Sequence, residues 1–253
     1  MNWTRTRQVA RTALTPRAWL MTALASMPLL AGAVEAPAAE LKPFTASYTI
    51  SWHGMSAGTA QLQLQRLPDG RWSYQSLSTA RGLFRLAMPA ELRSRTIFTI
   101  REGRIVPELF TADDGAASSS KDQELRFDWN TGRVTGVAEK RSVDLPLQPG
   151  LLDTMSVQIA LMHELLSGGT PRHFVLVDKD KIKDYDYTAV GQEPLSTPIG
   201  EFSSVIFRSA RPGSTTGTYF WCAPMLGFLP LKVERRDGSK VQWSMSLVTA
   251  STN

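Results

Sequence analysis

From residue 43 onward, hydrophobic and polar side chains alternate along the chain with a period of two. In residues 43–52 every second position is apolar, beginning at Phe44, and serines and threonines fill the positions between. The same pattern returns in residues 60–64, 125–129 and 241–247. Such alternation predicts strands with one buried face and one face in water.

Short turn signals separate these apolar runs. They are Asp69-Gly70, Glu102-Gly103, Asn130-Thr131-Gly132 and Asp237-Gly238. Gly and Asn adopt positive φ angles at little cost, so these strings favour tight turns between antiparallel neighbours. We therefore expect about a dozen antiparallel strands, including a single strand over residues 133–147.

Residues 153–166 break the alternation and predict a helix. Asp153 is a suitable N-cap, and a pair of glycines ends the segment. Met155, Ile159 and Met162 form an apolar stripe, which neighbouring leucines and a valine widen. A stripe this broad needs a large covering surface. We expect a mainly β fold, in which a curved antiparallel sheet or open half-barrel of about a dozen strands packs on this one central helix.

The first 39 residues differ in composition from the rest. Four arginines precede an apolar run at residues 18–31, and small residues follow it. This order is typical of a cleaved secretory signal peptide, and the run is shorter than the roughly 20 residues that a membrane-spanning helix needs. We therefore expect a signal peptide at 1–39, a single β-rich domain at 40–253, a periplasmic location, and no integral membrane span after processing.

Charge and cysteine content exclude several classes of protein. The whole chain has 28 basic and 23 acidic residues, and residues 1–39 contain four Arg and one Glu, which leaves 24 basic against 22 acidic residues and a net charge of +2. No basic stripe with interleaved aromatics suits a nucleic acid, so we exclude that partner. The single cysteine, Cys222, cannot form an internal disulfide and is best interpreted as a small buried residue.

The most specific catalytic motif is Gly54-Met55-Ser56-Ala57-Gly58, which matches the G-x-S-x-G string of serine hydrolases. In those enzymes a helix follows the serine, whereas residues 59–65 alternate as a strand. A turn between two strands therefore explains the motif better than a nucleophilic Ser56 does. The histidines, His53, His163 and His173, show no metal-binding spacing, so we predict no catalytic residue, no metal and no cofactor.

Apolar side chains indicate a different kind of site. Residues 82–89 are largely hydrophobic, lie between two predicted strands and are flanked by Arg81 and Arg85, so they suit a lid or a contact with an acidic lipid surface. Four inward-facing tryptophans and the helix stripe are first of all core residues, but they also suit the wall of a cavity. The predicted ligand-binding residues are Trp52, Trp72, Phe84, Trp129, Met155, Ile159, Met162 and Trp243.

Several short strings follow one another in an order that resembles a known family. They are Pro43-Phe44-x-Ala46-x-Tyr48, Gly54-x-x-x-Gly58, Gly103-x-Ile105-x-Pro107, Asp153-Thr154, Thr197-Pro198-x-Gly200-x-Phe202, Trp221-x-x-Pro224 and Leu229-Pro230-Leu231-Lys232-Val233-Glu234. Together they resemble the bacterial exported family catalogued as domain of unknown function 3108. The resemblance implies an architecture similar to the open half-barrel over a helix in the lipoprotein carriers LolA and LolB, and it supplies no catalytic residue.

Three functional hypotheses follow. The leading one is a periplasmic, non-enzymatic binding or carrier protein for a lipid or another amphiphile of the cell envelope. The first alternative is an envelope structural or assembly factor that recognises a protein partner through a strand edge or through residues 82–89. The second alternative is a serine hydrolase that uses Ser56.

Overall fold

The computed structural model describes residues 40–116 and 118–252, so the predicted signal peptide lies outside the described residues. The described residues belong to one compact unit. Its strands are β1 (Phe44–Trp52), β2 (Met55–Arg66), β3 (Trp72–Ala80), β4 (Leu92–Arg101), β5 (Arg104–Asp113), β6 (Gln123–Asp128), β7 (Arg133–Ala138), β8 (Arg141–Pro146), β9 (Leu151–Asp153), β10 (His173–Asp178), β11 (Lys181–Thr197), β12 (Gly200–Ala210), β13 (Thr216–Ala223), β14 (Leu229–Asp237) and β15 (Lys240–Thr252). The helices are α1 (Phe84–Ala87) and α2 (Ser156–Leu166), with the 3-10 helices η1 (Ser119–Lys121) and η2 (Pro224–Leu226). Neither α helix of this described part is long and apolar enough to cross a bilayer.

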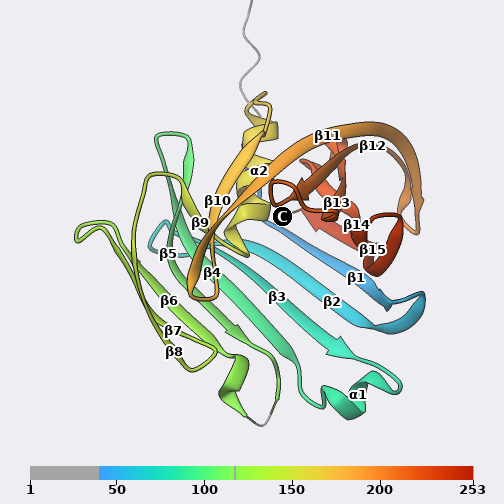
Figure 1. The fold of residues 1–253 in the computed structure, drawn as a ribbon. Helices are drawn as coiled ribbons and strands as arrows, with labels where there is room; N and C mark the ends of the chain where they lie inside the picture. Colours follow the sequence, from blue (N-terminus) through green and yellow to red (C-terminus); the bar gives the residue numbers. More distant parts are fainter. Residues whose placement is uncertain (1–39, 117, 253) are drawn as a thin grey trace, which may run out of the picture. The chain divides into compact units, whose positions relative to one another are not determined.

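All fifteen strands form one sheet (Figure 1). Their spatial order is β8-β7-β6-β5-β4-β3-β2-β1-β15-β14-β13-β12-β11-β10-β9. From β1 to β8 and from β10 to β15, consecutive strands pair as antiparallel hairpins, while β1 pairs antiparallel with β15 and β9 pairs parallel with β10. The structure therefore confirms the expected mainly β fold with an open, curved antiparallel sheet.

The expectation of a single strand over residues 133–147 is wrong. The segment is a hairpin of β7 and β8, and its turn residues Glu139 and Lys140 have φ angles of 52° and 65°. Gly or Asn usually occupies turn positions with positive φ. A turn made of Glu and Lys therefore gives no turn signal in the sequence. The structure also adds β9, whose three residues are too few to show a period.

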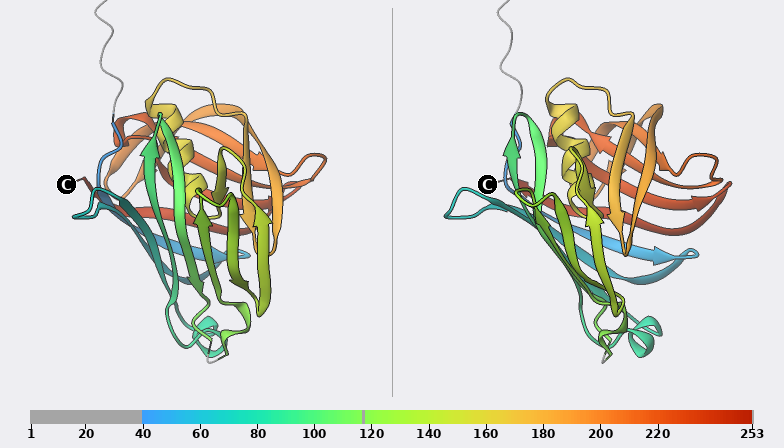
Figure 2. Two further views of the ribbon diagram at one scale, coloured as in Figure 1. Left: turned by 90° about the vertical axis from the view of Figure 1, so that its left-hand side faces the viewer. Right: turned by 60° about the vertical axis from the view of Figure 1, so that its left-hand side comes forward.

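Helix α2 lies inside the curve of the sheet, as expected (Figure 2). It begins at Ser156, three residues after the predicted N-cap. Asp153 nevertheless caps it, because Asp153 Oδ1 accepts hydrogen bonds from the backbone N–H groups of Met155 and Ser156, each at 2.8 Å. Most of the first two turns are buried, since strands surround the helix on several sides.

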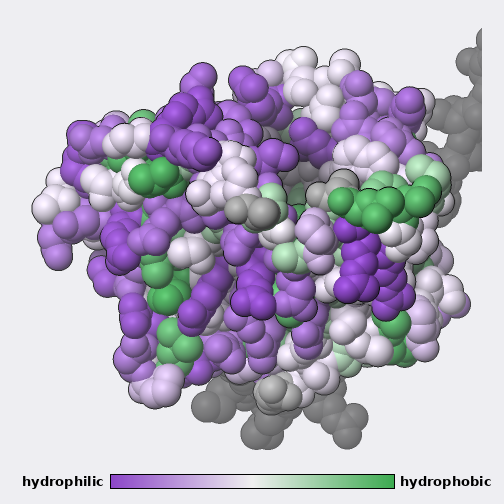
Figure 3. Space-filling view, turned by 90° about the horizontal axis from the view of Figure 1, so that it is seen from below, coloured by the Kyte–Doolittle hydropathy of each residue, from purple (hydrophilic) through white to green (hydrophobic). Residues whose placement is uncertain are grey.

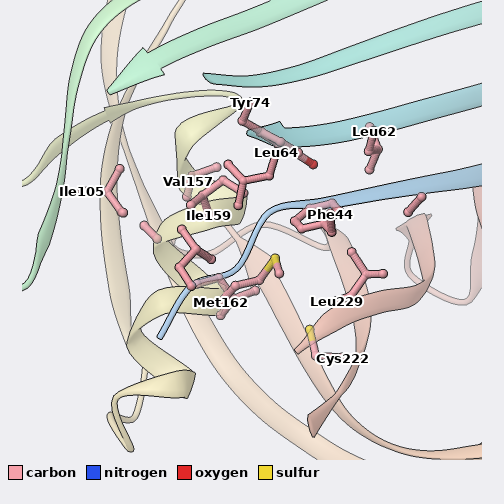
Figure 4. Close-up of a cluster of buried hydrophobic side chains, with 14 of the residues drawn as sticks. Phe44, Leu62, Leu64, Tyr74, Ile105, Val157, Ile159, Met162, Cys222 and Leu229 are labelled. Atoms are coloured by element: carbon pink, nitrogen blue, oxygen red, sulfur yellow. The ribbon is translucent and has the colours of Figure 1, made fainter. Parts of the chain in front are cut away.

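Two clusters of buried side chains make up the core. In the first, Ile159 and Met162 of α2 pack with Phe44 of β1, Leu64 of β2 and Leu229 of β14 (Figure 4). These strands lie on both sides of the β1–β15 pairing in the sheet. In the second, Phe110, Leu125 and Phe127 at one end of the sheet pack against Leu151 and Val177 at the other end. The two ends of the open sheet therefore meet through side chains, although β8 and β9 do not pair.

Polar contacts cross the same seam. Thr96 Oγ1 on β4 donates a 2.7 Å hydrogen bond to Asp153 Oδ2 on β9, and both side chains are buried. Lys179 Nζ in the β10–β11 turn lies 2.6 Å from Glu139 Oε1 in the β7–β8 turn. Surface ion pairs of this kind contribute little to stability, so the buried contacts hold the seam.

The antiparallel order divides the turns between two rims of the sheet. The rim that carries the β1–β2, β3–β4 and β14–β15 turns includes α1, and we call it the α1 rim. The opposite rim carries the start of β1, the end of β15 and the β13–β14 connection with η2, and we call it the α2 rim because the last turn of α2 lies there.

Candidate apolar binding site

An apolar cavity of about 350 Å³ opens at the α2 rim. It lies between the start of β1, the last turn of α2 and the β13–β14 connection. Its apolar lining consists of Leu41, Phe44, Met162, Leu166, Pro224, Met225, Leu226, Leu229 and Ala250. We call it the α2–η2 cavity.

Local sequence explains why these side chains converge. Phe44 begins the alternation of β1 and therefore points to the core side, where it is buried. The chain leaves β13 through the apolar string Pro224-Met225-Leu226, and Gly227 reverses it with a φ of 64°. The connection is apolar where most turns are polar, and its side chains line the cavity although Pro224 and Met225 are also exposed.

The mouth of the cavity carries an exposed methionine and polar groups. Met225 is 87% exposed there, and its unbranched thioether adapts to ligands of different shape. Glu40, Lys42, Ser251 and Thr252 supply the polar groups of the lining. An apolar interior with a few polar groups is the usual composition of a small-molecule pocket, and it suits a molecule with one apolar and one polar end.

The structure does not bring the eight predicted ligand-binding residues together. Met162 lines the α2–η2 cavity. Ile159 and Trp72 are buried in the first core cluster, where Trp72 stacks on Phe98 with ring centroids 6.4 Å apart. Met155 contacts both core clusters.

The remaining predicted residues lie elsewhere. Trp129 packs on the second cluster, and its Nε1 donates a 2.6 Å hydrogen bond to the Pro107 carbonyl. Trp52 is 45% exposed and lies opposite Trp243 near the end of the β1–β15 pair, and Phe84 is part of α1. These last three belong to the α1 rim.

Several cavity residues escape the sequence analysis. Leu41 stands between the predicted signal peptide and the first strand, and Leu226 lies between two strands, so neither belongs to a periodic segment. The signal that could identify this part of the cavity is the apolar string at residues 224–226, because polar turn residues usually occupy a connection between two strands.

A second hollow has a different character. A groove of about 690 Å³ crosses β3 to β7, and its lining includes Arg93, Arg95, Asp113, Glu124 and Lys140. Charges of both signs make it a poor site for a long apolar chain, because burying charged groups against hydrocarbon is costly.

Three carboxylates gather beside this groove. Oxygen atoms of Asp113, Asp114 and Asp122 lie within 4.8 Å of one another, and Lys121 Nζ lies 4.0 Å from Asp114. The sequence analysis does not anticipate this cluster, and we assign no ion to it.

A further cavity, of about 470 Å³, lies beside the last two turns of α2 and is lined by His163, Glu164, His173 and Phe174 among others. His163 Nε2 lies 3.1 Å from the Gly103 carbonyl oxygen. Partial burial raises the pKa of the Glu164 carboxyl above its usual range. These groups do not form the base and nucleophile pair that covalent catalysis needs.

Ser56 is placed on a strand and not at a strand-to-helix turn. It is exposed on β2, which continues to Arg66. Among the described residues, no hydrogen bond joins Ser56 to His53. Cys222 is fully buried in the first core cluster, and burial raises the pKa of its thiol to about 12. A thiol in that state is not a nucleophile at neutral pH.

Comparisons with known proteins give one sequence-family match and several matches to solved structures of low sequence identity. A family model described as "Protein of unknown function (DUF3108)" matches residues 47–242. No curated protein matches the sequence. Among solved structures, a β-barrel-like protein of domain of unknown function DUF1849 from Brucella abortus is 11% identical, with a TM-score of 0.54, covering 85% of this chain and 100% of that chain. This likeness shows the fold alone.

Two further solved structures are less similar. The MucA/MucB complex of Pseudomonas aeruginosa gives 13% identity and a TM-score of 0.37, covering 84% of this chain and 52% of that chain. This chain therefore spans about half the length of the matched chain. A putative lipoprotein from Parabacteroides distasonis gives 12% identity and a TM-score of 0.35, covering 84% and 97%. At these TM-scores neither carries a functional argument.

Proposed function

This chain belongs to the DUF3108 family, as its sequence strings predict, and we propose that it is a non-enzymatic binding protein of the bacterial cell envelope that holds the apolar chain of a lipid or another amphiphile. The observation that carries this proposal is the α2–η2 cavity, whose lining is apolar inside and polar at the mouth. Export to the periplasm is part of the proposal, and the composition of residues 1–39 supports it.

The size and lining of the cavity favour one apolar chain over a compact polar ligand. Its volume of about 350 Å³ lies at the lower end of the roughly 300–1,000 Å³ that ligand pockets occupy. Apolar surface removed from water contributes roughly 25 cal/mol per Å², so a chain that fills the cavity binds without a strong polar anchor. Lys42 at the mouth is suited to an acidic head group.

Native mass spectrometry with dodecanoate tests this proposal. Protein freed of lipid is expected to take up one dodecanoate molecule and to melt at a higher temperature with the ligand than without it. A Leu226→Asp variant places a carboxylate in the cavity wall and is expected to weaken binding at least tenfold.

A Val190→Asp variant is the matched control, because Val190 is 48% exposed on β11 and does not line the cavity. Its affinity for dodecanoate should equal that of the wild type. A wild type without any adduct, or equal binding by both variants, contradicts the proposal.

The alternative of a protein-binding factor is favoured by one feature, the edge of β8. This strand pairs only with β7 among the described residues, and a partner strand can add to such an edge. A photo-crosslinker at the exposed Ser142 of β8, compared with one at the exposed Thr249 of the central strand β15, separates the two functions. A discrete crosslinked protein at Ser142 only, together with absence of a dodecanoate adduct, favours this alternative.

A further inference from the structure

Four of the exposed large hydrophobic side chains lie on the α1 rim. Leu83 and Leu86 are each 83% exposed, Met55 is 58% exposed and Trp52 is 45% exposed. Leu83 immediately precedes the short helix α1, which Figure 1 labels, and Leu86 lies within it. We call these four residues, with Arg81 and Arg85, the α1 patch.

The backbone brings the two halves of this patch to the same place. β1 ends at Trp52 and β2 begins at Met55, while β3 ends at Ala80. Gly58 of β2 pairs with Ala80, and the Arg81 N–H donates a 2.8 Å hydrogen bond to the Ala57 carbonyl. The β1–β2 turn and the β3–β4 connection that contains α1 therefore lie on the same rim, at the ends of adjacent strands.

The polar residues of the patch are basic. Arg81 and Arg85 are exposed, and no ion pair of the described residues includes either of them. Lys240 of the adjacent β14–β15 turn adds a third exposed cation on this rim. Seen from below, this side of the molecule shows hydrophobic side chains directly beside strongly hydrophilic ones (Figure 3).

Some of the acidic groups on this rim have polar partners. Glu91 lies 2.9 Å from Arg93, and Asp237 accepts hydrogen bonds from the hydroxyls of Thr215 and Thr216. Asp114 lies 4.0 Å from Lys121. Asp113 and Asp122, which lie beside Asp114, have no ion pair among the described residues, so the unpaired positive charge is local to Arg81 and Arg85, the sequence neighbours of the exposed leucines.

We propose that the α1 patch docks this protein on an anionic phospholipid surface. Leu83, Leu86 and Met55 enter the boundary between head groups and acyl chains, and Trp52 lies at the level of the head groups, where tryptophan is enriched. Arg81 and Arg85 contact lipid phosphates. Exposed leucines flanked by unpaired arginines match a surface that is apolar inside and negatively charged outside. The docking surface does not depend on whether the α2–η2 cavity holds a ligand.

Flotation with vesicles tests the docking. The protein without residues 1–39, which keeps the whole described sheet and core, is mixed with vesicles of equal parts phosphatidylglycerol and phosphatidylcholine, or of phosphatidylcholine alone. We expect binding to the anionic vesicles, weaker binding to the neutral ones, and a decline as salt increases. An Arg81→Gln/Arg85→Gln variant should bind anionic vesicles about tenfold or more weakly and with less dependence on salt.

A Leu83→Ser/Leu86→Ser variant should also bind at least tenfold more weakly, because both side chains no longer gain from entering the bilayer. The control is Val190→Ser, which removes an exposed apolar side chain of β11 that belongs neither to the α1 patch nor to the α2–η2 cavity and should leave vesicle binding unchanged. Because both leucines are exposed, these changes should not alter the melting temperature.

Three outcomes overturn the proposal. The first is no binding to either kind of vesicle, and the second is equal binding by the wild type and both α1 patch variants. The third is a dimer in light scattering that only the Leu83→Ser/Leu86→Ser variant loses, because that result assigns the patch to a second copy of the chain. Uptake of dodecanoate by that variant, measured by mass spectrometry, shows separately whether the cavity binds its ligand.

Discussion

Asp153 links three parts of the molecule through one buried carboxylate. It ends β9, caps α2 through the N–H groups of Met155 and Ser156, and accepts a hydrogen bond from Thr96 on β4. Burial raises the pKa of this carboxyl above its usual value near 3.8, and the hydrogen bonds only partly oppose that effect. The folded state therefore binds this proton more tightly than the unfolded chain does.

This pKa shift predicts a pH dependence of stability. The contribution of the Asp153 proton is complete below about pH 3.8 and is lost as the pH rises through the raised pKa of the folded state. An Asp153→Asn variant keeps an acceptor for the two N–H groups but does not titrate. The free energy of unfolding of the wild type minus that of the variant should therefore fall as the pH rises from 3.5 toward neutrality and then become constant.

Urea titrations at a series of pH values measure this difference. A Thr96→Val variant serves as the second test, because removal of the donor raises the pKa further and should extend the decline to higher pH. A difference that stays flat from pH 3.5 to 7 contradicts the assignment of the titrating group to Asp153.

At the scale of single elements, α2 is the part whose packing the sequence predicts best. Its position in the hollow follows from the apolar stripe, and Ile159, which is fully buried, contacts residues of the first core cluster. Ile159→Ala should lower the free energy of unfolding by about 2–5 kcal/mol, because it removes buried apolar contacts and leaves a cavity. A Gln158→Ala variant on the same helix is the control, since Gln158 is only partly buried. Equal stability of both variants in urea would show that α2 is not part of the core.

The same comparison shows where sequence reasoning ends. Alternation identifies the inward face of β1, so Phe44 is predicted to be buried, and glycines predict the β4–β5 turn at Glu102-Gly103. The β7–β8 turn has no such residue and is missed. Of the eight predicted ligand-binding residues, only Met162 lines the apolar cavity, because periodicity tells which face is inward but not which inward side chains another element covers.

At the scale of the whole molecule, the seam between the sheet ends determines how the protein unfolds. The second core cluster joins β5, β6 and β7 to β9 and β10, and Met155 connects it to the first cluster. Because β9 and β10 contribute buried side chains to both clusters, loss of one cluster exposes part of the other. We expect tryptophan fluorescence and far-ultraviolet circular dichroism to report one coincident transition in urea.

Val177→Ala is the decisive variant. Val177 lies on β10, near the opposite end of the strand order from β5, β6 and β7, yet it is buried in the same core cluster as side chains of those strands. If the seam makes the molecule one cooperative unit, this substitution lowers the midpoint of the single transition and keeps both probes coincident. If β9, β10 and β11 instead form an independent flap, the variant separates the two probes into an early and a late transition. The first result also implies that a ligand in the α2–η2 cavity, which touches only the first cluster, raises the midpoint for the entire sheet.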